Sequence, residues 1–453
     1  MNNAQPSGQK SAYFLSLTLE NVRCFKKKQT LDLSDGHGNP VQWNVIMGNN
    51  GTGKTTLLQC LALCEPMLGT MLEEPYLSTA SGPRETEAST FSAYFPIGSK
   101  IGFLEPATYL DKDWMFSVAV ASGSRFTEKT SYEITKPFGF KSFPGIPTPY
   151  RSVDLGGLKC YGYGASRRQR QSLLAEKNLG FMHISSLFDE QAELPNAEEW
   201  LLQLDYLAKR TRNPKIRLQK ERAIELLIKV LPDVEDIGFR PNNQKVGLEF
   251  KTSYGWVKQR ELSLGYRTLI AWLSDLTGRM FDRYPESPNP IAEPAVVLID
   301  EIDLHLHPIW QRDILGFLSE RFQNTQFIVT AHSPLVAQAI PNLNQDTAKA
   351  NLIVLKQEED YVVIRNDMES IRSWRVDQIL SSELFETGTY PENLESLLKE
   401  RRKILSKDAL SRQDQKRLQE LALKIGPLPS AESPRDIKAM ELIHLAANEL
   451  KSR

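Results

Sequence analysis

One stretch of this chain constrains its fold more than any other: NVIMGNNGTGKTTLLQCLALC, residues 44–64. An apolar run meets a glycine-rich turn, and a lysine and two threonines open a helical pattern. Residues 48–55 fit the spacing G-x-x-x-x-G-K-[ST] without a gap. Glycines let backbone N–H groups curl around a phosphate, and the next helix offers its positive end to the same anion. The stretch predicts a phosphate-binding loop between a buried strand and a helix.

The residues of this loop have distinct predicted tasks. We expect Lys54 to reach the β- and γ-phosphates of a nucleotide and the hydroxyl of Thr55 to bind Mg²⁺. The implied ligands are therefore a nucleotide with β- and γ-phosphates and Mg²⁺. The other loop residues predicted to contact the nucleotide are Gly48, Asn49, Asn50, Gly51, Thr52, Gly53 and Thr56.

A second apolar run, AVVLIDEIDLHLHPIWQ, ends in two acids. Asp300 at the end of a buried strand beside the loop can hold Mg²⁺, and Glu301 can act as general base toward a water. His305 and His307 follow, separated by one residue. We interpret them as part of a turn before Pro308 rather than as a metal pair.

Two more sites complete the candidate set. The strand in FIVTAHSPLVA ends in His332, which could donate a hydrogen bond to the γ-phosphate. In ELSLGYRTL, Ser263 stands at a predicted helix start, with Gly265 two residues on. Serine is a good N-cap, which alone explains Ser263, but a helix start is also an anion site.

Buried apolar strands alternate with helical segments, so the predicted class is α/β with a largely parallel sheet. The amphipathic run FLSLTLENVRCF suggests antiparallel strands at its flank. The 453 residues suffice for two or three compact units. We expect a disordered lead-in, a first lobe with β-rich insertions, a helical insertion, a second lobe and a helical C-terminal region, over residues 1–12, 13–190, 191–232, 233–369 and 370–453.

The composition gives little guidance on partners. The net charge of −1 implies no global attraction to nucleic acid or membranes. No run long enough to span a membrane and no secretory leader is visible, so we expect a cytoplasmic protein. Cys60 and Cys64 have helical spacing, but nothing completes a metal site around them. Core packing is the favoured role of these thiols.

The order Lys54, Ser263, Asp300–Glu301, His332 resembles that of an ABC-type ATPase. The segments LTLENVRCF, LSLGYR, LIDEIDLHLHPIWQ and TAHSP are similar to the RecF/SMC-like branch, especially the Septu and PARIS ATPases of bacterial anti-phage systems, with the OLD family as a near relative. The resemblance covers roughly residues 13–356. It implies an ABC-type head with a helical insertion and a helical C-terminal region.

This resemblance assigns roles that the residues alone do not. Ser263 and Gly265 would form the signature that completes the site of a second copy across a head-to-head dimer. His332 would be the switch histidine, and Arg23 would lie near the phosphates. Gln169, Gln171 and Gln191 are alternatives for the Q-loop glutamine. Leu264 and Tyr266 depart from the transporter form of the signature, which argues against a transporter subunit.

Two basic stretches are candidates for nucleic-acid contact. Seven basic residues lie between Lys209 and Arg222, and a solvated helix face is the simpler interpretation. A shorter cluster, ASRRQRQ, contains Arg167, Arg168 and Arg170 and has the same two interpretations.

The last helical region suggests a hairpin for self-assembly or for a partner. No TOPRIM-like acidic group follows His332, so we expect any nuclease to be a separate effector protein. Two rival functions remain open at this point. One is a RecF/SMC-like repair ATPase acting directly on DNA, and the other is an ATP-locked scaffold that barely hydrolyses.

Overall fold

The structure is a computed structural model of the 453-residue chain. It divides into two compact units, Met1–Val376 and Asp377–Arg453, which are described separately. The residues that it describes are 12–20, 22–62, 115–122, 128–135, 159–170, 183–242, 245–343, 350–366, 376, 379, 392–405 and 411–425.

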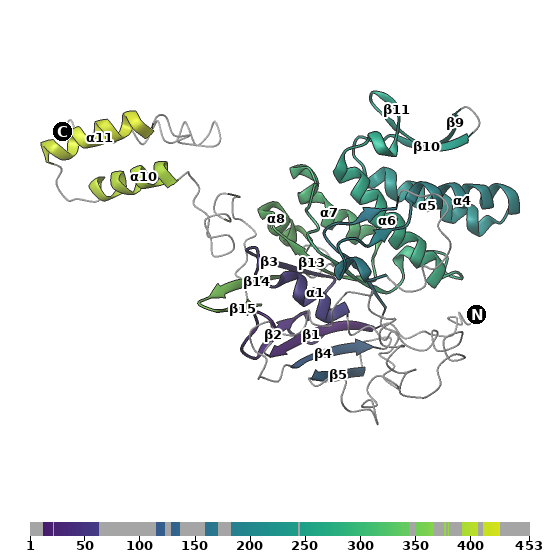
Figure 1. Cartoon of the computed structure of the whole chain (residues 1–453), viewed down its shortest axis with the longest axis horizontal. Coiled ribbons are helices and arrows are strands. Elements are labelled where there is room, and N and C mark those ends of the chain that lie inside the picture. Colours follow the sequence, from purple (N-terminus) through teal and green to yellow (C-terminus); the bar gives the residue numbers. More distant parts are fainter. Residues whose placement is uncertain are drawn as a thin grey trace. The chain divides into compact units, whose positions relative to one another are not determined.

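A six-stranded sheet forms the centre of the first unit (Figure 1). Its strand order is β15-β14-β3-β13-β12-β6, and every neighbouring pair is parallel except β14 and β15. The strands are β3 (Trp43–Gly48), β6 (Cys160–Tyr163), β12 (Ala295–Ile299), β13 (Thr325–Ala331), β14 (Ala350–Glu358) and β15 (Tyr361–Arg365).

The central strands are apolar because both faces of this sheet are covered. Every residue of β12 and β13 is buried, and so are all but the last of β3. Parallel strands bring their carboxyl ends to the same edge of a sheet, which is the usual place for a ligand. The phosphate loop after β3, the acids after β12 and His332 after β13 therefore meet at one edge.

A four-stranded antiparallel sheet lies beside it, in the order β2-β1-β4-β5. Its strands are β1 (Ala12–Glu20), β2 (Gln29–Asp32), β4 (Met115–Ser122) and β5 (Glu128–Thr135). The helix α1 (Lys54–Ala62) packs between the two sheets (Figure 1). Its Leu57 and Leu61 share one hydrophobic core with Leu17 of β1 and with Ile46 and Leu298 of the central sheet. This contact fixes the direction in which the helix leaves the phosphate loop.

Backbone and side-chain hydrogen bonds join the two sheets where their strands do not pair. The carbonyl of Cys24 accepts a hydrogen bond from the N–H of Val362 in β15. The amide of Gln29 donates to the carbonyl of Val362 and accepts from the N–H of Ile364. The outer edge of β15 is thus bound to the segment around residues 24–29, far away in sequence.

Helices and a small sheet make up the rest of the first unit. The helices are α4 (Ala197–Thr211), α5 (Pro214–Val230), α6 (Leu264–Arg283), α7 (Pro308–Arg321) and α8 (Pro334–Leu343). An antiparallel sheet contains β9 (Asp236–Asn242), β10 (Lys245–Thr252) and β11 (Gly255–Lys258), and β7 (Arg168–Gln169) pairs with β8 (Glu193–Leu194). Short 3-10 turns span Ser185–Leu187, Gln259–Glu261 and Pro290–Ala292.

The second unit contains the helical hairpin of α10 (Glu392–Leu405) and α11 (Arg412–Ile425). Both Nε and Nη2 of Arg417 donate to the carboxylate of Glu400, at 2.7 and 3.0 Å, and join the two helices. In the part of the chain that the structure describes, no helix is long and apolar enough to cross a membrane.

The predicted fold class is confirmed, including the antiparallel strands at the flank of a mainly parallel sheet. Asn196 is the N-cap of α4, since its side chain accepts from the N–H of Glu199 at 3.1 Å. The helical insertion contains two helices, because Arg212 adopts a left-handed conformation and Pro214 starts a new helix. The predicted lead-in before Ala12 and most of the insertions of the first lobe lie outside the described residues.

Candidate nucleotide-binding site

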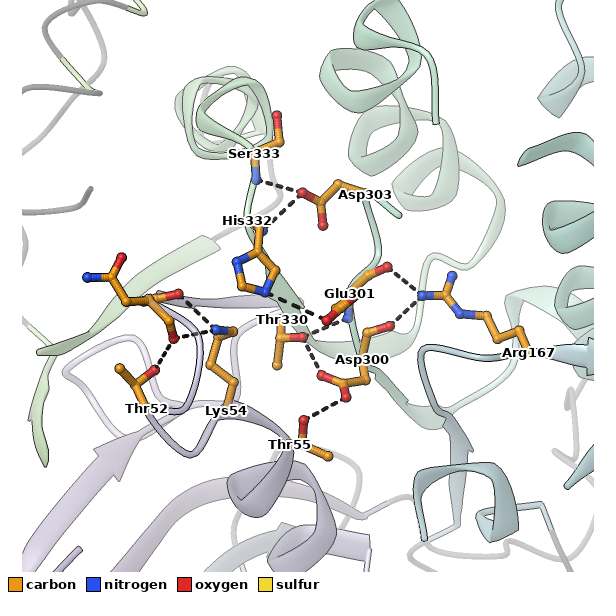
Figure 2. Close-up of polar contacts among 12 residues, drawn as sticks. Thr52, Lys54, Thr55, Arg167, Asp300, Glu301, Asp303, Thr330, His332 and Ser333 are labelled. Carbon is orange, nitrogen blue, oxygen red and sulfur yellow. Dashed lines mark hydrogen bonds and ion pairs between the residues drawn. The ribbon is translucent and has the colours of Figure 1, made fainter. Parts of the chain in front are cut away.

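A pocket of about 350 Å³ lies at the carboxyl edge of the central sheet. Figure 2 shows the residues that converge there from the phosphate loop and from the ends of β12 and β13. The residues that line the pocket are Arg23, Cys24, Asn50, Gly51, Gly53, Lys54, Thr55, Thr56, Asp300, Glu301 and His332.

The phosphate loop is already closed around the ammonium group of Lys54. This group donates to the carbonyls of Gly48 and Asn49, at 2.8 and 2.9 Å (Figure 2). Gly53 has φ of +85°, and a Cβ there would lie 2.5 Å from Sγ of Cys24. Only glycine tolerates both the conformation and the contact. The glycine thus lets the loop pack directly against Cys24.

Asp300 connects the loop to the neighbouring strands. Its Oδ2 accepts from the hydroxyl of Thr55 at 2.7 Å, and its Oδ1 accepts from the hydroxyl of Thr330 at 2.6 Å. A hydroxyl and a carboxylate oxygen side by side are the hard ligands that Mg²⁺ prefers. Mg²⁺ usually takes only one or two protein oxygens and fills its other positions with water and phosphate. The pair therefore fits a nucleotide-bound Mg²⁺.

Glu301 and His332 face each other across the pocket, with Nε2 of His332 3.7 Å from Oε1 of Glu301 (Figure 2). Glu301 has φ of +51°, in the left-handed region that is uncommon for a residue with a side chain. Oδ2 of Asp303 accepts from the N–H groups of His332 and Ser333, at 2.9 and 2.6 Å. Asp303 thereby holds the turn that carries the histidine.

Burial shapes the electrostatics of the two cations in the pocket. Burial lowers the pKa of Lys54, although the carboxylates of Asp300, Glu301 and Asp303 act in the opposite direction. Burial likewise lowers the pKa of Arg23, whose Nη1 donates to the hydroxyl of Thr56 at 3.2 Å. Two partly desolvated cations in one pocket favour an anionic ligand.

Arg167 is buried against this site, which sequence reasoning did not expect. Its guanidinium donates to the main-chain carbonyls of Asp300 and Glu301 and, at 3.0 Å, to that of Gly164 (Figure 2). The interpretation of ASRRQRQ as a solvated or nucleic-acid-binding cluster is therefore wrong for Arg167, whereas its neighbour Arg168 is exposed.

Ser263 and Gly265, the candidate signature residues, do not line the pocket of their own chain. Ser263 is the N-cap of α6 and accepts from the N–H of Tyr266 at 3.3 Å. A Cβ on Gly265 would lie 2.2 Å from the carbonyl oxygen of His305. Gly265 thus lets the start of α6 lie directly against the turn after β12.

The remaining candidates that the structure describes do not line the pocket. Gln169 accepts a hydrogen bond from Gln259, Gln191 is exposed, and Gln171 lies outside the described residues. His307 is the N-cap of α7, as the turn interpretation predicts, and His305 is exposed. Among the described residues, no group of three or more His, Cys, Asp or Glu could hold a metal ion.

The basic stretch between Lys209 and Arg222 is partly neutralised by acids. Lys209 and Lys220 both contact the buried carboxylate of Asp205, at 2.7 and 3.2 Å. Lys215 contacts Glu286 at 2.6 Å. These pairs favour the interpretation as a helix face and leave nucleic-acid contact a prediction.

Comparisons with known proteins agree with this geometry. A family model described as "AAA domain" matches residues 16–65, which include the phosphate loop. A second, described as "AAA domain, putative AbiEii toxin, Type IV TA system", matches residues 170–337, which include Ser263, the two acids and His332. Septu protein PtuA of Bacillus mycoides is 26% identical over 83% of this chain and 45% of its own length. The chain is thus similar in sequence to a Septu protein over most of its length. The resemblance that the motifs indicated is thus confirmed.

Other relatives match shorter parts. The "Retron Ec83 probable ATPase" of Escherichia coli is 34% identical over 35% of this chain and 27% of its own length. The chain spans less than half the length of both relatives. Among solved structures, the SMC head domain from Thermotoga maritima aligns with a TM-score of 0.35 and 15% identity, over 79% of this chain and 99% of that chain.

Proposed function

We propose that this chain is an ABC-type ATPase that binds ATP with Mg²⁺, pairs head to head with a second copy and hydrolyses the nucleotide to control a partner effector. The observation that carries this proposal is the meeting of Lys54, Thr55, Asp300, Glu301 and His332 at one pocket. The phosphate loop alone would support binding, but the second acid adds the means for hydrolysis.

In the proposed mechanism, the backbone of the phosphate loop and Lys54 hold the β- and γ-phosphates. Thr55 and Asp300 would hold Mg²⁺, which supplies charge neutralisation on the phosphate oxygens when bound. Glu301 accepts a proton from a water molecule while the oxygen of that water attacks the γ-phosphorus. The bond between the γ-phosphorus and the bridging oxygen breaks, and that oxygen leaves with ADP. His332 donates a hydrogen bond to the γ-phosphate and responds to its loss.

A second copy completes the site in this proposal. The hydroxyl of Ser263 caps the N-terminus of α6. The first N–H groups of a helix attract anions. Because these groups do not line the pocket of their own chain, we infer that they contact the nucleotide of the partner copy. ATP would then hold two heads together until hydrolysis separates them.

The partner effector, such as a nuclease, and the role in anti-phage defence are proposed from similarity to the Septu and retron ATPases. The chain covers only part of those relatives, so the effector and the defence role are proposed from sequence similarity alone.

The decisive experiment compares Glu301→Gln with Glu320→Gln, an exposed acid of α7 that serves as matched control. We expect the first change to lower ATP turnover by about 100-fold or more, because it removes the proton acceptor while keeping the size of the side chain. The control should keep wild-type turnover. Fluorescent-nucleotide binding should be equal in all three proteins.

The same preparations test the dimer. With ATP, Glu301→Gln should accumulate as a dimer in light scattering, and a further Ser263→Arg change should abolish that dimer. Equal turnover in Glu301→Gln and wild type would refute the assignment of the base. Binding without measurable turnover in the wild type would favour the ATP-locked scaffold instead.

A further inference from the structure

The guanidinium of Arg167 lies behind the acids of the pocket rather than in it. The residue is 3% exposed and is absent from the pocket lining. Its guanidinium donates to three main-chain carbonyls, those of Gly164, Asp300 and Glu301. A buried arginine that binds main-chain oxygens stabilises a backbone conformation rather than a ligand.

The carbonyls of Asp300 and Glu301 belong to the two peptide groups on either side of the Cα of Glu301. The first, between Asp300 and Glu301, has its C=O bound by Arg167 and its N–H bound by the hydroxyl of Thr330 at 2.7 Å. The second, between Glu301 and Ile302, has its C=O bound by Arg167 and its N–H bound by the carbonyl of Thr330 at 2.9 Å.

With both peptide planes held, the direction of the Cα–Cβ bond of Glu301 is fixed. This matters because Glu301 has the left-handed φ of +51°, a conformation that costs free energy unless its surroundings enforce it. Arg167 and Thr330 supply that enforcement from opposite sides of the turn.

We propose that Arg167 is a positioning residue, which aims the carboxylate of Glu301 at the attacking water without touching the nucleotide. This inference rests on the proposed ATPase function. The arginine suits the task because one guanidinium can donate to several carbonyls at once, in a fixed planar arrangement. Burial lowers its pKa to about 10, so it keeps its charge at neutral pH.

The test replaces Arg167 by Met and by Lys in the full chain and measures turnover, KM and nucleotide affinity. Displacing the general base should lower kcat while leaving the nucleotide affinity unchanged. We expect Arg167→Met to lower kcat by about 10- to 100-fold, the order of magnitude of a small misplacement of reacting groups. The nucleotide Kd should change by less than about 3-fold, because no donor of Arg167 faces the pocket. Arg167→Lys should recover part of the lost kcat.

The matched control is Arg168→Met. It removes the same charge from the neighbouring residue, which is exposed. It should leave kcat and Kd unchanged. Unaltered kcat in Arg167→Met, while Glu301→Gln is inactive, would overturn the positioning role and leave the ATPase proposal intact. A parallel loss of nucleotide binding and kcat in both Arg167 variants would show a general structural role and overturn it as well. Absence of turnover in the wild type would overturn both proposals.

Discussion

At Gly265, the first turn of α6 passes so close to the turn after β12 that no side chain fits. The carbonyl oxygen of His305 would lie 2.2 Å from an added Cβ. Backbone atoms on both sides cannot rotate away as a flexible side chain could. Packing within the chain therefore requires glycine at this position of the candidate signature, independently of any role toward a second copy.

We expect Gly265→Ala to lower the free energy of unfolding by about 1–3 kcal/mol, the usual cost of forcing an extra group into a packed site. Thermal unfolding would measure it. The control is Gly316→Ala in α7, where an added Cβ meets nothing within 4 Å. Alanine is the better helix former by about 1 kcal/mol, so the control should be unchanged or more stable. Equal melting temperatures for the two variants would contradict the steric argument.

The site residues that the sequence identified are those with a short-range pattern. Lys54 follows fixed spacing within one loop, and Asp300, Glu301 and His332 follow buried strands whose carboxyl ends must meet at one edge of a parallel sheet. Arg167 has no such pattern. Its burial follows from the turn after β6, which directs Arg167 inward and Arg168 outward, and adjacent arginines look alike in a sequence.

At the scale of elements, β6 and α6 are joined by a buried polar contact. The hydroxyl of Tyr163 donates to Oδ2 of Asp275 at 2.9 Å, and Nε of Arg279 donates to the same oxygen at 2.8 Å. The side chain of Asp275 is 3% exposed. This contact links the helix that begins at Ser263 to the strand that leads to Arg167.

We expect Asp275→Ala to destabilise the chain by about 3–5 kcal/mol, because it leaves the guanidinium of Arg279 without its counter-charge in the interior. Chemical denaturation would measure the loss. The exposed Asp313 of α7 gives the matched control, and its change to Ala should cost well under about 1 kcal/mol. A small effect at Asp275 would mean that water reaches Arg279 and that the contact contributes little.

Element types could be predicted here better than element ends and partners. The alternating pattern of β1 and the apolar runs of β12 and β13 identified their strands. The break at Arg212 was missed because the basic residues around it suit a helix equally well. The side-chain contacts between β15 and residues 24–29 join segments more than 300 residues apart, which no local pattern reveals.

At the scale of the whole molecule, the nucleotide pocket belongs to one unit. Every residue that lines it precedes Val376, where the first compact unit ends. We expect a chain that stops at Val376 to bind fluorescent ATP with a Kd within about 3-fold of the full chain, since a domain with its own core can fold alone. Loss of binding on truncation, with the circular dichroism of a folded protein, would show that the α10–α11 unit supports the site.

The hydrogen bond from Val362 to Cys24 has a consequence for biosynthesis. Arg23 and Cys24 form one wall of the pocket, and β15, near residue 362, holds their backbone in place. During synthesis the phosphate loop leaves the ribosome early. The strand that holds the wall of the pocket is translated more than 300 residues later. A nascent chain would thus complete this wall of the candidate pocket only after Asp300, Glu301 and His332 have been made.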